Sequence, residues 1–169
     1  TPYPTLFPYT TLFRSGCESM QISSRFTIAI HSLAVIYLRQ DHQRVTSNFL
    51  AESIQVNPVV VRSVLSGLKA AGIIESRQGS GGSRLAKPLD AITFYDIYVT
   101  VDSVDKEGLF NFHPNPHQDC PVGRNIHQAV DGKLIQIQAA MENELKRLTM
   151  QDVVDDLEKA IAQSAQSFK

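Results

Sequence analysis

Apolar residues recur at helical spacing in several separate segments of the chain. In residues 20–38 the apolar positions fall three or four apart, so they share one face of a helix. This face consists of Phe26, Ile30, Leu33 and Tyr37. The spacing predicts a first helix whose apolar face is turned toward a core.

Two shorter helical segments follow and are separated by an asparagine–proline pair. Thr46 or Ser47 can cap the first of them, because a short side-chain oxygen accepts from free N–H groups of the first turn. The first segment should end before Asn57, since a residue that precedes proline is pushed out of the helical region. Asn57 can in turn cap the second segment, with Pro58 in its first turn. The apolar stripe of that second helix is Val61, Val64, Leu65 and Leu68.

The stretch after the second helix has the pattern of a β-hairpin. Gly72 is expected to end the helix, because glycine readily adopts the left-handed conformation found there. Residues 73–77 and 83–87 are the expected strands, and the glycine-rich residues 78–82 form the tip between them. Helix, turn, helix and hairpin in this order predict a winged helix-turn-helix. In that fold the second helix enters the major groove of DNA and the hairpin tip lies beside it.

The remainder of the chain predicts a short helix, an irregular segment and a long helix with one apolar stripe. Thr93 can cap the short helix, and Thr149 with Asp152 has the spacing of a capping box that starts a last helix. A long apolar stripe needs a partner surface, and a second copy of the chain is the expected partner. The stripe consists of Ile126, Ala129 or Val130, Leu134, Ile137, Met141, Leu145 and Leu148.

Composition places the 169-residue chain, which is 43% hydrophobic, among globular proteins. Its two cysteines cannot build a disulfide framework and no apolar run could span a bilayer, so a reducing cytoplasm is expected. The fold class that follows is mostly α-helical with a small β-hairpin wing. We expect a non-native or disordered leader at 1–19, a winged domain at 20–101, an irregular sensor-type loop at 102–124, and a dimerisation helix with a C-terminal helix at 125–169.

Charge differs between the two halves of the chain, although the whole carries only −1. Residues 20–90 carry a net charge of +4, and residues 91–169 carry −5. A basic half that also holds the winged pattern is typical of a protein that binds nucleic acid on one side. No Ser/His/Asp arrangement, paired carboxylates or nucleotide motif stands in a suitable context, so we do not expect an enzyme.

Two segments carry a resemblance to a known family. Residues 71–88, AGIIESRQGSGGSRLAKP, and residues 91–102, AITFYDIYVTVD, resemble the Rrf-two family of bacterial regulators. That family includes the iron–sulfur cluster regulator and the cysteine metabolism repressor. The likeness runs from Met20 to about Leu157 and implies a homodimeric transcription factor, a repressor, on a palindromic operator. The alternative is a winged domain that contacts other proteins and no DNA.

The predicted DNA contacts lie on the polar side of the second helix and around the wing. Arg62 is the expected base-reading residue, most simply of guanine. The resemblance places Arg25 near the DNA backbone. In the family a basic residue often precedes the first wing glycine, whereas Gln78 stands here, so minor-groove reading is expected to fall to Arg77 or Arg84. The full predicted set is Arg25, Val59, Arg62, Ser63, Ser66, Lys69, Arg77, Gln78, Ser80, Gly81, Gly82 and Arg84.

The predicted irregular loop contains Cys120. Cluster-binding members of the family carry three cysteines in this region, and only Cys120 is present here, so we expect no iron–sulfur cluster and no other cofactor. Three interpretations remain open. Cys120 is a thiol sensor with a pKa lowered at a helix start, a metal ligand with His113, His117 and His127, or an inert relic. Cys120 is our predicted sensing residue, and no metal site is predicted.

Overall fold

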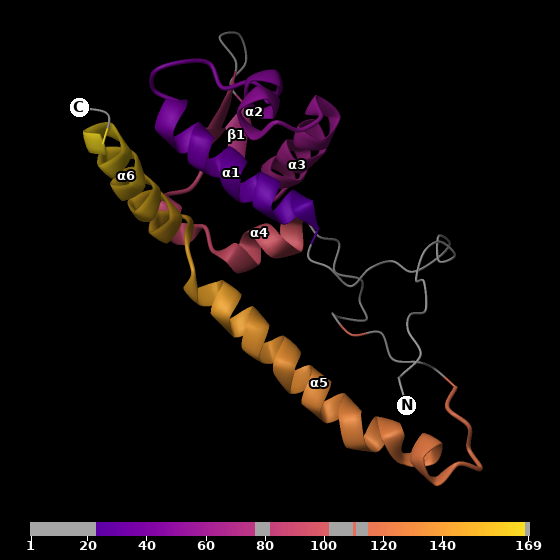
Figure 1. The fold of residues 1–169 in the computed structure, drawn as a ribbon. Helices are drawn as coiled ribbons and strands as arrows, with labels where there is room; N and C mark the ends of the chain where they lie inside the picture. The colour runs from indigo at the N-terminus through magenta and orange to yellow at the C-terminus, as the bar shows by residue number, and fades with distance from the viewer. Residues whose placement is uncertain (1–22, 77–81, 102–109, 111–114, 168–169) are drawn as a thin grey trace, which may run out of the picture.

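The computed structural model describes residues 23–76, 82–101, 110 and 115–167, which form helices and one β-hairpin (Figure 1). The predicted leader and most of the predicted irregular loop lie outside these residues. The fold class, mostly helical with a hairpin wing, is confirmed. The elements are α1 (Ser24–Arg39), α2 (Ser47–Ile54), α3 (Pro58–Ala70), β1 (Ile74–Ser76), β2 (Ser83–Leu85), the 3-10 turn η1 (Leu89–Ala91), α4 (Phe94–Val101), α5 (Pro121–Arg147) and α6 (Met150–Ser167).

The helix-turn-helix forms around the two predicted caps. The side chain of Thr46 accepts a hydrogen bond from the backbone N–H of Phe49 at 3.2 Å, which caps α2. Asn57 accepts from the backbone N–H of Val59 at 2.8 Å, and Pro58 occupies the first turn of α3. Both predictions are confirmed, because a cap depends only on residues within one helical turn.

The end of α3 directs the chain into the wing. Gly72 has a positive φ of 66°, as predicted for the residue that ends this helix. Its N–H donates to Lys69 O at 3.0 Å, and the N–H of Ile73 donates to Leu68 O at 3.0 Å. These two bonds form a Schellman motif, which satisfies carbonyls left free at the helix end. β1 and β2 then pair antiparallel within the predicted strand segments.

One core joins α1, α2, α3, α4, η1, the start of α6 and the base of the wing. Leu33, Leu50, Leu68 and Ile97 are fully buried in it. Phe26, Phe94 and Tyr98 add edge-to-face ring contacts, with Phe26 centroid distances of 5.8 Å to Phe94 and 6.3 Å to Tyr98.

The inward face of α1 differs in part from the prediction. Leu33 and Phe26 are buried and Ile30 is partly buried, but Tyr37 is 37% exposed. The prediction that Tyr37 faces inward is wrong. The fully buried face of α1 runs through Ala29, Leu33 and Ile36, and Ile36 occupies the inward position in place of Tyr37. The helix begins at Ser24, with Ser23 at the N-cap position.

The long helix α5 projects away from the winged domain (Figure 1). It begins at Pro121, ahead of the predicted start at residue 125, because proline is well suited to the first turn of a helix. None of its residues is buried. It packs against α4 near its own C-terminal end, where Lys146 Nζ lies 4.3 Å from the ring centroid of Tyr95. Within the described ranges, no helix is both long and apolar enough to cross a membrane.

The last helix, α6, returns to the winged domain and packs on η1 and α1. The Thr149 N–H donates to the Asp152 carboxylate at 2.8 Å, and the Asp152 N–H donates back to Thr149 Oγ1 at 3.4 Å. This confirms the predicted capping box. A backbone bond from Met150 N–H to Ile92 O at 2.9 Å ties the start of α6 to the segment before α4.

Candidate nucleic-acid interface

The polar side of α3 is open to solvent. Its opposite side, formed by Val61, Val64 and Leu68, is buried against the core, and this fixes which side faces outward. The outward residues are the five that the sequence predicted for this helix: Val59, Arg62, Ser63, Ser66 and Lys69. Val59 is 64% exposed, which leaves a small apolar surface of the kind that can contact a thymine methyl group.

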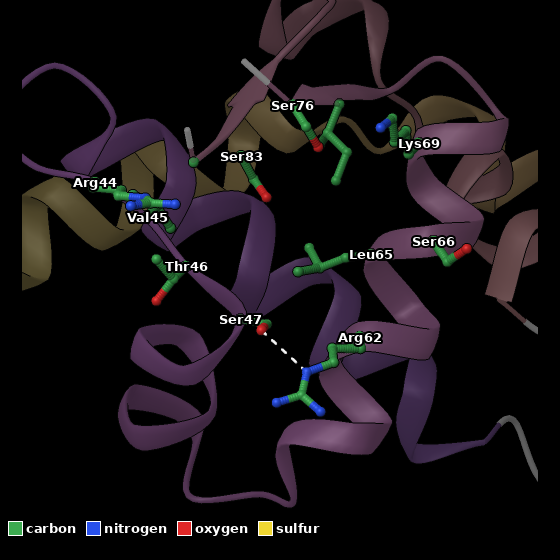
Figure 2. A pocket seen from close by; sticks show the side chains of 12 residues that line it. Arg44, Val45, Thr46, Ser47, Arg62, Leu65, Ser66, Lys69, Ser76 and Ser83 are labelled. Atoms are coloured by element: carbon green, nitrogen blue, oxygen red, sulfur yellow. Dashed lines mark hydrogen bonds between the residues drawn. The ribbon is translucent and has the colours of Figure 1, made fainter. Parts of the chain in front are cut away.

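A groove of about 460 Å³ runs between α2, α3 and the wing. Figure 2 shows Arg44, Arg62 and Lys69 around it, with Ser83 and Ser76 of the two strands on its upper side. None of its lining residues is acidic. Because Arg44, Arg62 and Lys69 line the groove and no carboxylate does, its potential is positive. A positive groove suits the phosphate backbone of a nucleic acid.

Arg44 was missing from the sequence prediction. It precedes Val45, whose side chain is buried and whose carbonyl accepts from Ser83 N–H at 2.9 Å, so Arg44 is held beside the wing. The sequence did offer a local signal for Arg44: it directly precedes the apolar Val45 and the helix cap Thr46, which hold it next to the start of α2. The groove itself was not visible in the sequence, because its walls come from three separate segments.

Gly82 packs closely against Arg44 and Val45, and this close approach explains why a glycine is needed there. The sequence analysis placed both Gly81 and Gly82 among the predicted DNA contacts of the wing. A Cβ on Gly82 would stand 3.0 Å from Val45 N and 3.2 Å from Val45 O. Gly82 is therefore needed for close packing at the base of the wing, while Gly81 lies outside the described residues.

Arg84 is engaged within the protein. Its Nη2 donates to Gln40 O at 3.2 Å and pairs with the carboxylate of Asp41, while the Gln40 side chain accepts from Leu85 N–H at 3.0 Å. These bonds fasten β2 to the end of α1. A DNA phosphate would have to compete with Asp41, so the predicted contact by Arg84 stays a prediction. The other wing residues in the predicted set, Arg77, Gln78, Ser80 and Gly81, lie outside the described residues.

Arg25 lies on the other side of α3. It is exposed in the first turn of α1 and lines a hollow of about 110 Å³ together with Ser63 and Thr100. The structure thus brings Arg25 next to the outward face of α3, although the two are far apart in sequence. This position is compatible with the predicted backbone contact.

Cys120 is an exposed free thiol at the N-cap position of α5. The backbone N–H groups of Gly123 and, to a smaller extent, Val122 favour the charged form and lower the pKa of the thiol. Gly123 permits the tight loop before this helix, since a Cβ there would stand 2.5 Å from His117 O.

The described residues do not fit a metal or cluster site around Cys120. Among residues 23–76, 82–101, 110 and 115–167, no group of three or more His, Cys, Asp or Glu side chains could hold a metal ion. His127 Nδ1 lies 3.1 Å from the Asp131 carboxylate, and His117 is exposed. His113, the remaining residue of the metal alternative, lies outside the described part, as does the second cysteine, Cys17. An iron–sulfur cluster is held by several thiolates, so this donor set does not suit one.

Comparison with known proteins agrees with this geometry. The "Putative HTH-type transcriptional regulator YwnA" of Bacillus subtilis (strain 168) is 40% identical over 136 residues, which cover 80% of this chain and 98% of YwnA. The crystal structure of "a putative DNA binding protein" is 36% identical, covers 76% of this chain and 97% of its own, and has a TM-score of 0.60. "T. potens IscR", at 19% identity, covers 86% of this chain and 93% of its own with a TM-score of 0.59, which shows a shared fold.

The descriptions of YwnA as a putative transcriptional regulator and of the solved structure as a putative DNA binding protein agree with the predicted regulator. A family model described as "Rrf2: Iron-dependent Transcriptional regulator" matches residues 22–156. The match covers most of the chain, including the helix-turn-helix, the wing and α5. The chain therefore belongs to the Rrf2 (Rrf-two) family of transcriptional regulators.

Proposed function

We propose that this regulator binds duplex DNA with the outward face of α3 in the major groove. The observation that carries the proposal is the exposure of Val59, Arg62, Ser63, Ser66 and Lys69 on one side of a helix whose other side is buried. Arg62 is the residue best suited to read a base edge, because a guanidinium can donate two parallel hydrogen bonds to guanine. Lys69, Arg44 and Arg25 bind phosphates on either side of α3.

We also propose that the protein binds a palindromic operator as a homodimer. The apolar stripe of α5 has no buried residue, and Ile137 on it is 56% exposed in the single chain. A helix of this length is stabilised mainly by packing of its apolar face, so the stripe calls for a partner. A second copy related by a two-fold axis would place two α3 helices on half-sites one helical turn, or a multiple of it, apart.

A dimer on such an operator can act as a repressor, because it occupies DNA that the transcription machinery needs. The sequence supplies no catalytic centre for another mode of action. Cys120 is our proposed sensing residue. Its thiol is exposed and its lowered pKa increases the thiolate fraction, and the thiolate is the form that reacts with peroxides and electrophiles.

The proposed function is tested by selecting duplexes with the purified protein and then measuring affinity by fluorescence anisotropy over a series of salt concentrations. Arg62→Ala is expected to lose about 1–3 kcal/mol on the selected duplex and to relax the preference at one base pair in each half-site. Arg147→Ala is the matched control, since Arg147 is an exposed arginine with a local partner on α5. It should leave the base preference unchanged.

Salt dependence separates DNA binding from the alternative of a protein-interaction module. Phosphate contacts release counterions, so the logarithm of the affinity should fall linearly with the logarithm of salt concentration. A protein that selects no sequence and shows no such dependence does not use its winged domain on DNA. Unchanged affinity and preference in Arg62→Ala would instead remove only Arg62 from the reading role.

Thiol sensing is tested with Cys120→Ser. Treatment with peroxide is expected to change operator affinity several-fold in the natural chain and not in the variant. Because the pKa of Cys120 is lowered, the reactive thiolate should persist at pH values below those of an ordinary thiol, and the reaction should slow only as the pH falls through the lowered pKa. Equal responses of the two proteins to peroxide would rule Cys120 out as the sensor.

A further inference from the structure

Arg62 is held in place by two residues of the neighbouring helix. Its Nε lies 3.4 Å from Ser47 Oγ and its Nη2 lies 3.2 Å from Asn48 Oδ1. Figure 2 shows the guanidinium between α3 and the first turn of α2, with the bond to Ser47 drawn. An exposed arginine has several free torsions, so two bonds from another element restrict its orientation substantially.

The two bonds use one particular edge of the guanidinium. Nε–H and one N–H of Nη2 point to the same side, and this edge faces Ser47 and Asn48. The other edge, formed by Nη1 and the second N–H of Nη2, keeps its donors. Five N–H donors in a fixed fork make this division possible. The remaining edge has the two parallel donors that match O6 and N7 of guanine.

Ser47 and Asn48 are well placed for this purpose. They form the first turn of α2, whose start is capped by Thr46 and whose Leu50 and Ala51 are buried, so their backbone is fixed. Both accept as neutral groups, which orient the guanidinium without neutralising its charge. Arg84 offers the contrast: its guanidinium is paired with the carboxylate of Asp41. A carboxylate beside Arg62 would offset the positive charge that attracts DNA, whereas an amide and a hydroxyl leave that charge in place.

We propose that Asn48, assisted by Ser47, is a positioning residue that turns the free edge of Arg62 toward guanine and so sets the base preference. The inference rests on the proposed function, since it concerns how α3 reads DNA. Asn48 acts through Arg62 and not by its own contact with a base. Because Arg62 is already oriented, its side chain loses less conformational entropy on binding. This gain in affinity applies only where both acceptors of guanine are present.

The test is a double-mutant cycle with Asn48→Ala, Arg62→Ala and the double variant, read on two duplexes. One duplex is selected by the natural chain, and the other has 7-deazaguanine, which lacks the N7 acceptor, at the guanine assigned to Arg62. The measured quantity is the ratio of the two dissociation constants. Thermal unfolding of each variant verifies that the fold is kept, and Asn143→Ala, at an exposed position on α5, is the control.

The natural chain should prefer guanine by about fivefold to 100-fold, and Arg62→Ala should abolish the preference. Asn48→Ala should reduce the preference by about threefold to tenfold, the effect expected for one orienting hydrogen bond. In the Arg62→Ala background Asn48→Ala should change the ratio no further. Asn48→Asp keeps the acceptor oxygen, so it should retain the preference while a new negative charge weakens binding to both duplexes.

Three results would overturn the inference, and they differ from one another. If Asn48→Ala weakens both duplexes equally and adds to Arg62→Ala, Asn48 contacts the backbone directly and does not position Arg62. If Arg62→Ala still distinguishes guanine from 7-deazaguanine, another residue reads that base while DNA binding itself stands. If the natural chain shows no salt-dependent binding to any duplex, the proposed function fails and the inference fails with it.

Discussion

The winged domain and α5 are built from the same kind of amphipathic helix, but only the winged domain buries its apolar face fully within the single chain. In α3 the stripe ends on Leu68, which is fully buried, while on α5 Ile137 is 56% exposed and no residue is buried. The winged domain folds around contacts within one chain. On α5, Met141 and Leu145 pack against the core, but Ile137 on the same stripe is left exposed, which supports the proposed partner surface. The comparison separates the contacts that stabilise the winged domain from the surface that we propose for assembly.

The largest expected effect comes from a charge on the stripe of α5. Ile137→Glu would place a carboxylate in the proposed interface twice, once from each copy, and burial of an unpaired charge costs several kcal/mol. We expect a monomer by sedimentation or light scattering and a loss of cooperative binding to a palindromic duplex.

The control for this change is Gln136→Glu, which adds the same charge at an exposed neighbour away from the stripe. It should remain dimeric. A dimer that survives Ile137→Glu would mean that this part of the stripe is not the interface, and the contrast between the two regions would then need another explanation.

The next effect concerns the core of the winged domain. Leu33→Ala removes a fully buried side chain and is expected to lower the free energy of unfolding by about 2–5 kcal/mol. The loss should be independent of protein concentration, because the contacts lie within one chain. Ile137→Ala is the matched change on α5, and its loss should grow smaller as concentration rises, as for a dimer interface. Urea unfolding at two concentrations tests both.

The smallest effect is a pair of glycine substitutions with opposite signs. Gly82→Ala is expected to destabilise by about 1–3 kcal/mol, because its Cβ would crowd the backbone of Val45 at the base of the wing. Gly132→Ala, inside α5, meets nothing within 4 Å and should stabilise by about 0.5–1 kcal/mol through helix propensity. Thermal unfolding measures both, and a stabilising Gly82→Ala would show that the wing base can relax.

Local signals were sufficient for most element boundaries. The caps at Thr46, Asn57 and Thr149 and the left-handed Gly72 each depend on residues within about one turn, and all four are confirmed. The predicted inward position of the Tyr37 side chain was wrong, because the orientation of α1 depends on what packs against it. The start of α5 at Pro121 was missed, since proline was taken with the loop.

The order of the helices and strands, and the residues of α3 that could face outward, were predictable from the sequence, because helical periodicity and capping act over a few residues. The surroundings of those residues depend on how distant segments pack together. This packing placed Arg44 in the same groove as Arg62, tied Arg84 to Asp41, and set Asn48 against the guanidinium of Arg62. These relations join segments far apart in the chain, and only a packed core holds such segments at hydrogen-bonding distance.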